Sequence, residues 1–115
     1  MTAYMKAMSR EEGTECPVAL TLDMIGSSWT CLILRDLLLH GARRFQDFQT
    51  SLEGIAPTTL SDRLKNLEQN GIVERQFYSM SPPRAEYILT DKGRDLGPII
   101  GAMRRWGSKY RVDLA

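Results

Sequence analysis

The spacing of apolar residues in the middle of the chain predicts one helix around which the other elements are arranged. Its apolar stripe recurs at intervals of four and three residues and consists of Leu60, Leu64 and Leu67. Pro57 suits the first turn, where a missing N–H is not needed, and Gly71 suits the position just past the end. The pattern therefore predicts an amphipathic helix over about 57–70 with a polar outer face.

Two helices are predicted before it by the same reasoning. The first covers 17–25 and would turn three apolar side chains inward, namely Val18, Leu22 and Ile25. The second runs from Trp29 to about Leu39 and ends at Gly41. Because it is apolar on nearly all sides, it is expected to be the central core helix.

A short helix is predicted directly before the 57–70 helix. Phe48 and Leu52 lie four residues apart and indicate a helix over 46–53, and residues 54–56 form a tight linker. Two short helices joined in this way, the second polar on its outer face, are typical of a helix-turn-helix.

The periodicity changes after Gly71. Residues 72–78 and 85–89 are rich in β-forming side chains, and a proline-rich turn with a basic tip separates them. This pattern predicts a hairpin, or wing, over about 72–90, which the short extended segment 42–45 is expected to join. The expected fold class is mainly α with a small β-hairpin wing (α+β), a winged helix-turn-helix.

The last helix is predicted over about 91–110, with a kink at Pro98. One side of it is apolar and carries Leu96, Ile99, Ile100, Met103, Trp106 and Tyr110. A small winged domain closes its core without this helix, so the stripe needs another partner, and the same stripe of a second copy is the simplest one. The alternative is that the helix folds back on its own domain.

Composition describes a single ordinary globular domain over 1–115. The chain is 43% hydrophobic and 25% charged, with a net charge of +1, so DNA binding would require positive charge concentrated on one face. No apolar run of about 18 residues is present, and the N-terminus lacks a signal-peptide core, so we expect a cytoplasmic protein. Two cysteines, one histidine and no Cys-x-x-Cys predict neither a metal site nor a cofactor.

The order of short motifs resembles the HxlR-type, MarR-like winged-helix regulators over about residues 16–107. The matching pieces include Cys16-Pro17-Val18, Trp29-Thr30, Gly41-Ala42-Arg43-Arg44-Phe45, Thr59-Leu60-Ser61-Asp62-Arg63-Leu64, Pro82-Pro83-Arg84-Ala85-Glu86-Tyr87 and Arg105-Trp106-Gly107. The resemblance implies a homodimer that binds a pseudo-palindromic operator, usually as an autoregulated repressor. It also implies a dimer built from the first and last helices, over about 2–12 and 91–110. The dimer residues expected in the first helix are Tyr4 and Met8.

In this interpretation double-stranded DNA is the partner and the 57–70 helix enters its major groove. Its expected base-reading residues are Thr58, Thr59, Asp62 and Lys65. Ser61 and Arg63 are expected to hold phosphates at the flanks, and Arg84 to enter the minor groove from the wing tip. Arg43 and Arg44 are predicted to touch the DNA backbone, with an ordinary solvated pair as the alternative. For the 57–70 helix, the alternative is that its polar outer face is simply solvated and binds no DNA.

Cys16 is a candidate redox switch, because it precedes a predicted helix start, where the helix dipole favours a thiolate. The resemblance supports this hypothesis, since some members of the family sense oxidants or electrophiles through a cysteine at the matching position. The alternative is a small buried apolar residue. Cys31, in the core helix, is expected to be inert packing.

Two other function classes compete with DNA binding. A thiol enzyme would need a base beside its cysteine, but His40 is the only histidine and it is expected at a helix end, so no enzyme is predicted. A winged-helix module that binds protein is the stronger rival, supported by the low net charge. An apolar patch on the recognition face would favour it, and a positive strip would favour DNA. The sequence does not define an effector.

Overall fold

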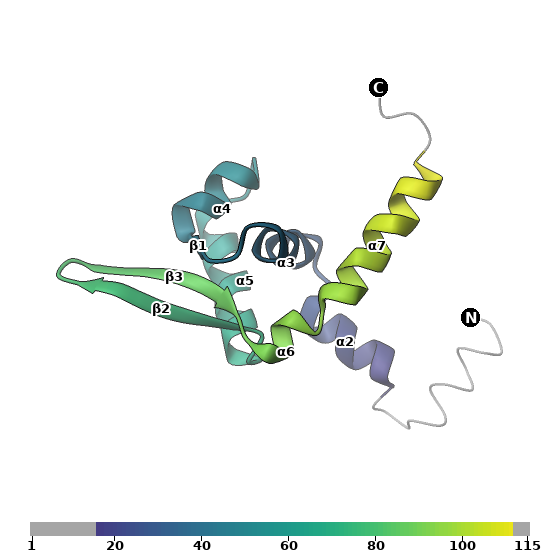
Figure 1. Cartoon of the computed structure of the whole chain (residues 1–115), viewed down its shortest axis with the longest axis horizontal. Helices are drawn as coiled ribbons and strands as arrows, with labels where there is room; N and C mark the ends of the chain where they lie inside the picture. Colours follow the sequence, from purple (N-terminus) through teal and green to yellow (C-terminus); the bar gives the residue numbers. More distant parts are fainter. Residues whose placement is uncertain (1–15, 112–115) are drawn as a thin grey trace.

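The computed structural model describes residues 16–111, and it shows a helical body from which a β-hairpin projects (Figure 1). The elements in chain order are α2 (Pro17–Ile25), α3 (Ser28–His40), β1 (Arg43–Arg44), α4 (Phe45–Ser51), α5 (Pro57–Gln69), β2 (Val73–Met80), β3 (Pro83–Leu89), α6 (Asp91–Arg94) and α7 (Gly97–Tyr110). The predicted mainly helical fold with a small antiparallel sheet is confirmed. The helix predicted over 2–12, with Tyr4 and Met8, lies outside the described residues.

Helix α3 is the central core helix, as predicted (Figure 1). Ile33, Leu34 and Leu37 are at most 2% exposed and belong to the same buried cluster as Phe48 of α4. Burying one such side chain contributes about 1.5–3 kcal/mol. This cluster therefore holds α3 against the helix-turn-helix that follows it.

Helix α5 packs its apolar stripe onto that cluster. Leu60, Leu64 and Leu67 are 0%, 1% and 0% exposed. The helix begins at Pro57, and the chain leaves it through Gly71, whose φ of +70° is a left-handed conformation that favours glycine. The predicted bounds of about 57–70 are confirmed.

The sheet has three antiparallel strands in the order β1-β3-β2. The residue Tyr87 of β3 faces Arg43 on one side and Arg75 on the other. Side chains alternate between the two faces of a strand, so these three lie on one face and Arg44 lies on the other. The strands of the hairpin are longer than predicted, because β2 continues to Met80.

The predicted 91–110 helix is two helices, and the predicted kink at Pro98 is wrong. Thr90 caps α6, since its Oγ1 accepts the Gly93 N–H at 3.1 Å. The chain then breaks at Asp95 and Leu96, and α7 starts anew with Pro98 in its first turn. Proline is tolerated there because the first-turn N–H has no intrahelical partner.

The prediction that Val18 and Leu22 of α2 face inward is also wrong. They are 41% and 59% exposed, whereas Ile25 is buried. Because α2 meets α3 at an 80° bend, only the end of α2 reaches the core, and the rest borders an open apolar hollow of about 370 Å³ beside α7. None of the described helices is by itself long and apolar enough to cross a membrane, although α2 and α3 meet that test when taken together.

Candidate nucleic-acid interface

The outer face of α5 carries the polar residues that the sequence singled out. Thr58, Ser61, Asp62 and Lys65 are exposed, and Thr59 is half-buried. They lie opposite the buried leucines of the same helix, so the packing that buries one face presents the other to solvent. The N-cap residue Ala56 provides no side-chain capping bond, which leaves the first-turn N–H groups directed outward.

Arg63, predicted to hold a phosphate, instead connects α5 to the start of α3. Its Nε donates to Ser27 Oγ at 3.1 Å, and its Nη1 donates to Asp62 Oδ2 at 2.7 Å. The first bond fixes the rotation of α5 relative to α3, and the second partly neutralises the carboxylate on the outer face. Ser27 is the N-cap residue of α3 and makes no side-chain capping bond, so its hydroxyl is available to Arg63.

Arg84 lies near the tip of the wing, away from the body of the domain. It is exposed and pairs in register with Ser79 of β2. The same hairpin exposes three large apolar side chains, Phe77 (49%), Tyr78 (51%) and Met80 (71%). The wing therefore presents a cation beside an apolar surface rather than a purely basic strip.

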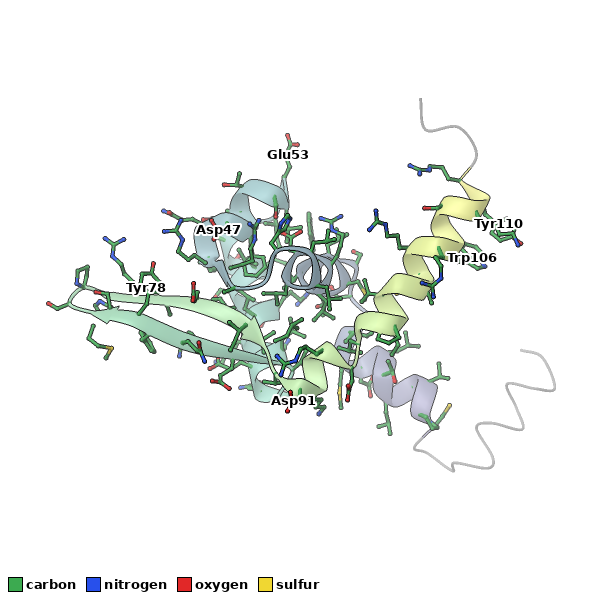
Figure 2. The ribbon with its side chains drawn as sticks, viewed as in Figure 1. Asp47, Glu53, Tyr78, Asp91, Trp106 and Tyr110 are labelled. Carbon is green, nitrogen blue, oxygen red and sulfur yellow. The ribbon has the colours of Figure 1, made fainter. Side chains whose placement is uncertain are left out.

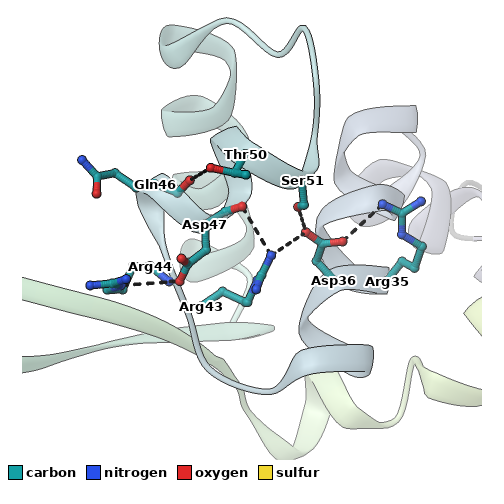
Figure 3. A network of polar contacts seen from close by, with 8 residues as sticks. All are labelled: Arg35, Asp36, Arg43, Arg44, Gln46, Asp47, Thr50 and Ser51. Atoms are coloured by element: carbon teal, nitrogen blue, oxygen red, sulfur yellow. Dashed lines mark hydrogen bonds and ion pairs between the residues drawn. The ribbon is translucent and has the colours of Figure 1, made fainter.

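Arg43 turns into the domain and takes part in a polar network around Asp36 of α3 (Figure 3). Asp36 is 2% exposed, and it accepts hydrogen bonds from Ser51 Oγ and from Arg35 Nη2. Arg43 Nη2 lies 3.6 Å from Asp36 Oδ2 and donates to the carbonyl of Asp47 at 3.3 Å. The network ties β1 and α4 to α3, so Arg43 has internal partners instead of a free outward position.

Arg44 lies on the opposite face of the sheet, with Asp47 (Figure 3) and Tyr78 as its polar partners. A hydrogen bond with Tyr78 and then one with Asp47 raise the pKa of the guanidinium, which keeps it charged. The Arg44 N–H donates to Asp47 Oδ2 at 2.8 Å and holds the pKa of that carboxyl below its usual range. Sequence reasoning missed Tyr78, since β1 and β2 are far apart in the sequence and come near each other only by pairing with the same strand, β3.

Comparison with known proteins identifies the family of this chain. The model of the HxlR-like helix-turn-helix family matches residues 24–114. The chain belongs to this family. The HxlR-like chain is 39% identical over 103 residues to YdeP of Bacillus subtilis, described as an uncharacterized HTH-type transcriptional regulator, with 90% of this chain and 80% of YdeP covered.

Solved structures of similar proteins agree with this assignment. One is the redox regulator HypR in its oxidized form, with a TM-score of 0.79, 39% identity, and coverage of 85% of this chain and 100% of HypR. Another is diamide-treated YodB from B. subtilis, with a TM-score of 0.66, 33% identity, and coverage of 84% and 93%. The HxlR-like protein is thus a DNA-binding transcriptional regulator with a winged helix-turn-helix fold, from a family of regulators rather than enzymes.

The two cysteines of this HxlR-like regulator lie in different parts of the domain, and Cys31 is the one that lies near α7. Cys16 is the residue just before α2 and is 9% exposed. Cys31 is half-buried, donates to the carbonyl of Ile25 at 2.9 Å and borders the hollow between α2 and α7. Burial raises the pKa of the Cys31 thiol, which keeps it in its less reactive form.

The Asp36 network predicts a loss of stability when its charge is removed. In the Asp36→Asn variant the partly buried Arg43 loses its counter-ion, and we expect the free energy of unfolding to fall by about 3 kcal/mol in urea titrations. Ser51→Ala removes only a neutral donor to the same carboxylate, and about 1 kcal/mol is expected. An Asp36→Asn variant as stable as the wild type would show that the network does not hold β1 and α4 in place.

Proposed function

We propose that the protein is a homodimeric repressor that binds a pseudo-palindromic operator and controls its own transcription. The observation that carries this proposal is the polar face of α5, held outward beside a wing by a fully buried leucine stripe. A major groove admits such a helix, and its hydroxyl, carboxylate and ammonium groups are types that read base edges.

The proposal assigns base reading to Thr58, Thr59, Asp62 and Lys65, which lie in the first three turns of α5. Ser61 at the flank is assigned to phosphate, and Arg84 to the minor groove, whose negative potential attracts arginine. Arg43 and Arg63 have partners inside the domain and Arg44 pairs with Asp47 and Tyr78, so the proposal does not depend on them.

The second copy is proposed to cover the exposed side of α7. Within α7, every residue of which is described, none is buried. Ile99, Met103, Trp106 and Tyr110 are 41–68% exposed, and Trp106 and Tyr110 point away from the body of the domain (Figure 2). Leu96 and Ile100, predicted with them, pack partly on their own core. The remaining stripe suits an isologous contact with its own copy.

A redox response through Cys16 is proposed as the signal. HypR is described as a redox regulator, and YodB has been treated with diamide, a thiol oxidant. Cys16 stands at the start of α2, on the side of the domain where the second copy is proposed to dock. A thiol oxidant such as diamide would join the Cys16 thiols of the two copies in a disulfide and take up the two electrons and two protons released. The new bond would alter the spacing of the two α5 helices.

A protein-binding wing is the second candidate function, and the apolar surface of Phe77, Tyr78 and Met80 favours it. DNA binding and protein binding differ in their salt dependence. Phosphate contacts release counterions, so affinity for a duplex should fall steeply with added salt, whereas an apolar protein contact should change little.

The Arg84→Ala variant is expected to weaken operator binding by about 1–3 kcal/mol. The operator is recovered by selecting random duplexes on the wild-type protein, and affinity is then measured by gel shift at fixed salt. Arg105→Ala, which removes the same charge from α7, is the control and should bind as the wild type. Equal affinities for all three proteins would remove Arg84 from the interface.

Trp106→Glu is expected to raise the dissociation constant of the dimer by about 100-fold, because each copy would bring an unpaired carboxylate into an apolar contact. Sedimentation velocity measures this constant. Arg105→Glu places a carboxylate off the stripe on the same helix and should leave the dimer intact. A wild-type protein that sediments as a monomer contradicts the proposed dimer.

Diamide is expected to change the operator affinity of the wild type and of Cys31→Ser, but not that of Cys16→Ser. The reason is that the Cys31 thiol is held in its protonated form by burial and donates to a carbonyl. The three proteins are compared by gel shift before and after oxidation. If Cys16→Ser responds as the wild type does, Cys16 is not the switch.

A further inference from the structure

A polar hollow of about 390 Å³ lies between α5 and the wing. We call it the α5–wing notch, and its lining residues are Ser61, Lys65, Glu68, Gln69, Arg75 and Tyr87. Four come from one side of α5, and two come from facing positions of β2 and β3. Apart from Ser61 and Lys65, none of these residues has a role in the function proposed above.

The two strand residues of the notch are adjacent. Arg75 and Tyr87 are direct partners in the β2–β3 register, so their side chains lie on the same face. Arg75 Nε lies 3.9 Å from Glu68 Oε2, and its guanidinium stands over the Phe77 ring at 5.4 Å. Burial raises the pKa of Tyr87, while Arg75 acts to lower it and Glu68 to raise it, which places the phenol in the field of both groups.

The charges of the notch leave one cation in excess. Lys65 and Arg75 are positive and Glu68 is negative. Arg75 and Glu68 are 46% and 39% exposed, so their 3.9 Å pair is weak and open to competition by an anion. The hydroxyls of Ser61 and Tyr87 and the amide of Gln69 add donors of the kind that bind phosphate oxygens.

The place of the notch matches the path of a DNA backbone. A helix in the major groove and a wing in the neighbouring minor groove stand on either side of one sugar–phosphate strand, because that strand separates the two grooves. The strand must therefore cross the gap between α5 and the hairpin. The α5–wing notch lies in that gap, since its lining comes from α5 on one side and from β2 and β3 on the other.

We propose that the α5–wing notch binds one phosphate of the DNA backbone, with Arg75 as the cation that contacts it and Ser61 and Tyr87 as its neutral donors, while Lys65, assigned above to base reading, adds its positive charge from the border of the notch. This inference rests on the proposed insertion of α5 and the wing into adjacent grooves. Glu68 holds Arg75 in place in the absence of DNA and competes with the phosphate for it. The contact fixes the position of the protein on the duplex without reading its sequence.

The test uses two opposed variants and a fixed 30-base-pair duplex of arbitrary sequence, since a phosphate contact does not depend on sequence. Arg75→Gln is expected to lower affinity about fivefold and to reduce the slope of log affinity against log salt by about one. Glu68→Gln is expected to raise affinity about threefold. Arg105→Gln, a matched loss of charge on α7, should change neither quantity. Because Glu68→Gln acts in the opposite direction, a folding defect cannot imitate the result.

Replacement of single phosphates by methylphosphonate locates the contact on the selected operator. One position in each half-site should weaken the wild type and leave Arg75→Gln unaffected. If the wild type binds no duplex at low salt, the proposed function fails. If it binds, and Arg75→Gln retains its affinity and salt slope, the notch is not a phosphate site although the proposed function stands.

Discussion

The burial of the α5 leucine stripe against α3 is the constraint on which the rest of this structure depends. Leu60, Leu64 and Leu67 have almost no exposed surface, and moving any of them outward would cost about 1.5–3 kcal/mol. A helix has a fixed angular spacing, so fixing the buried face also fixes which side chains point outward. The hydrogen bond from Arg63 to Ser27 opposes rotation of the helix about its axis. The interface is thus set by packing before any DNA is present.

The same structure explains how a protein with a net charge of +1 can bind a polyanion. Several arginines have partners inside the fold, as Arg43 does beside Asp36 and Arg94 does on the carbonyl of Leu89. Three cations stand on the α5 and wing side, Lys65 and Arg75 at the α5–wing notch and Arg84 near the tip of the wing. Local arrangement therefore matters more here than total charge.

Sequence reasoning predicted the helices, the hairpin and the outer face of α5, because their signals are local. Apolar spacing and capping residues such as Pro57, Gly71 and Thr90 act within a few positions. The wrong predictions concern how whole helices are oriented relative to the core. Val18 and Leu22 have a helical apolar pattern, but the steep angle between α2 and α3 keeps them out of the core. The sequence predicts a kink at Pro98 where the structure has a break before α7, because proline is compatible both with a kink inside a helix and with the first turn of a new helix.

Candidate site residues were harder to predict than the fold. Arg43 and Arg44 are adjacent and identical, yet a strand sends one inward to Asp36 and the other outward to Tyr78. Arg75 acquires its place only through the β2–β3 register and the approach of α5, a contact between residues distant in sequence. A pairwise contact of this kind leaves no periodic signal in one sequence.

In the proposed complex two copies insert their α5 helices into the major groove on one side of a duplex. Dimethyl sulfate protection of guanine N7 on the selected operator tests it most directly, because that atom faces the major groove. The account predicts two protected clusters whose centres lie about 10–10.5 base pairs, or a whole multiple of that, apart. A single cluster, or two clusters separated by a half-integral number of turns, would contradict it.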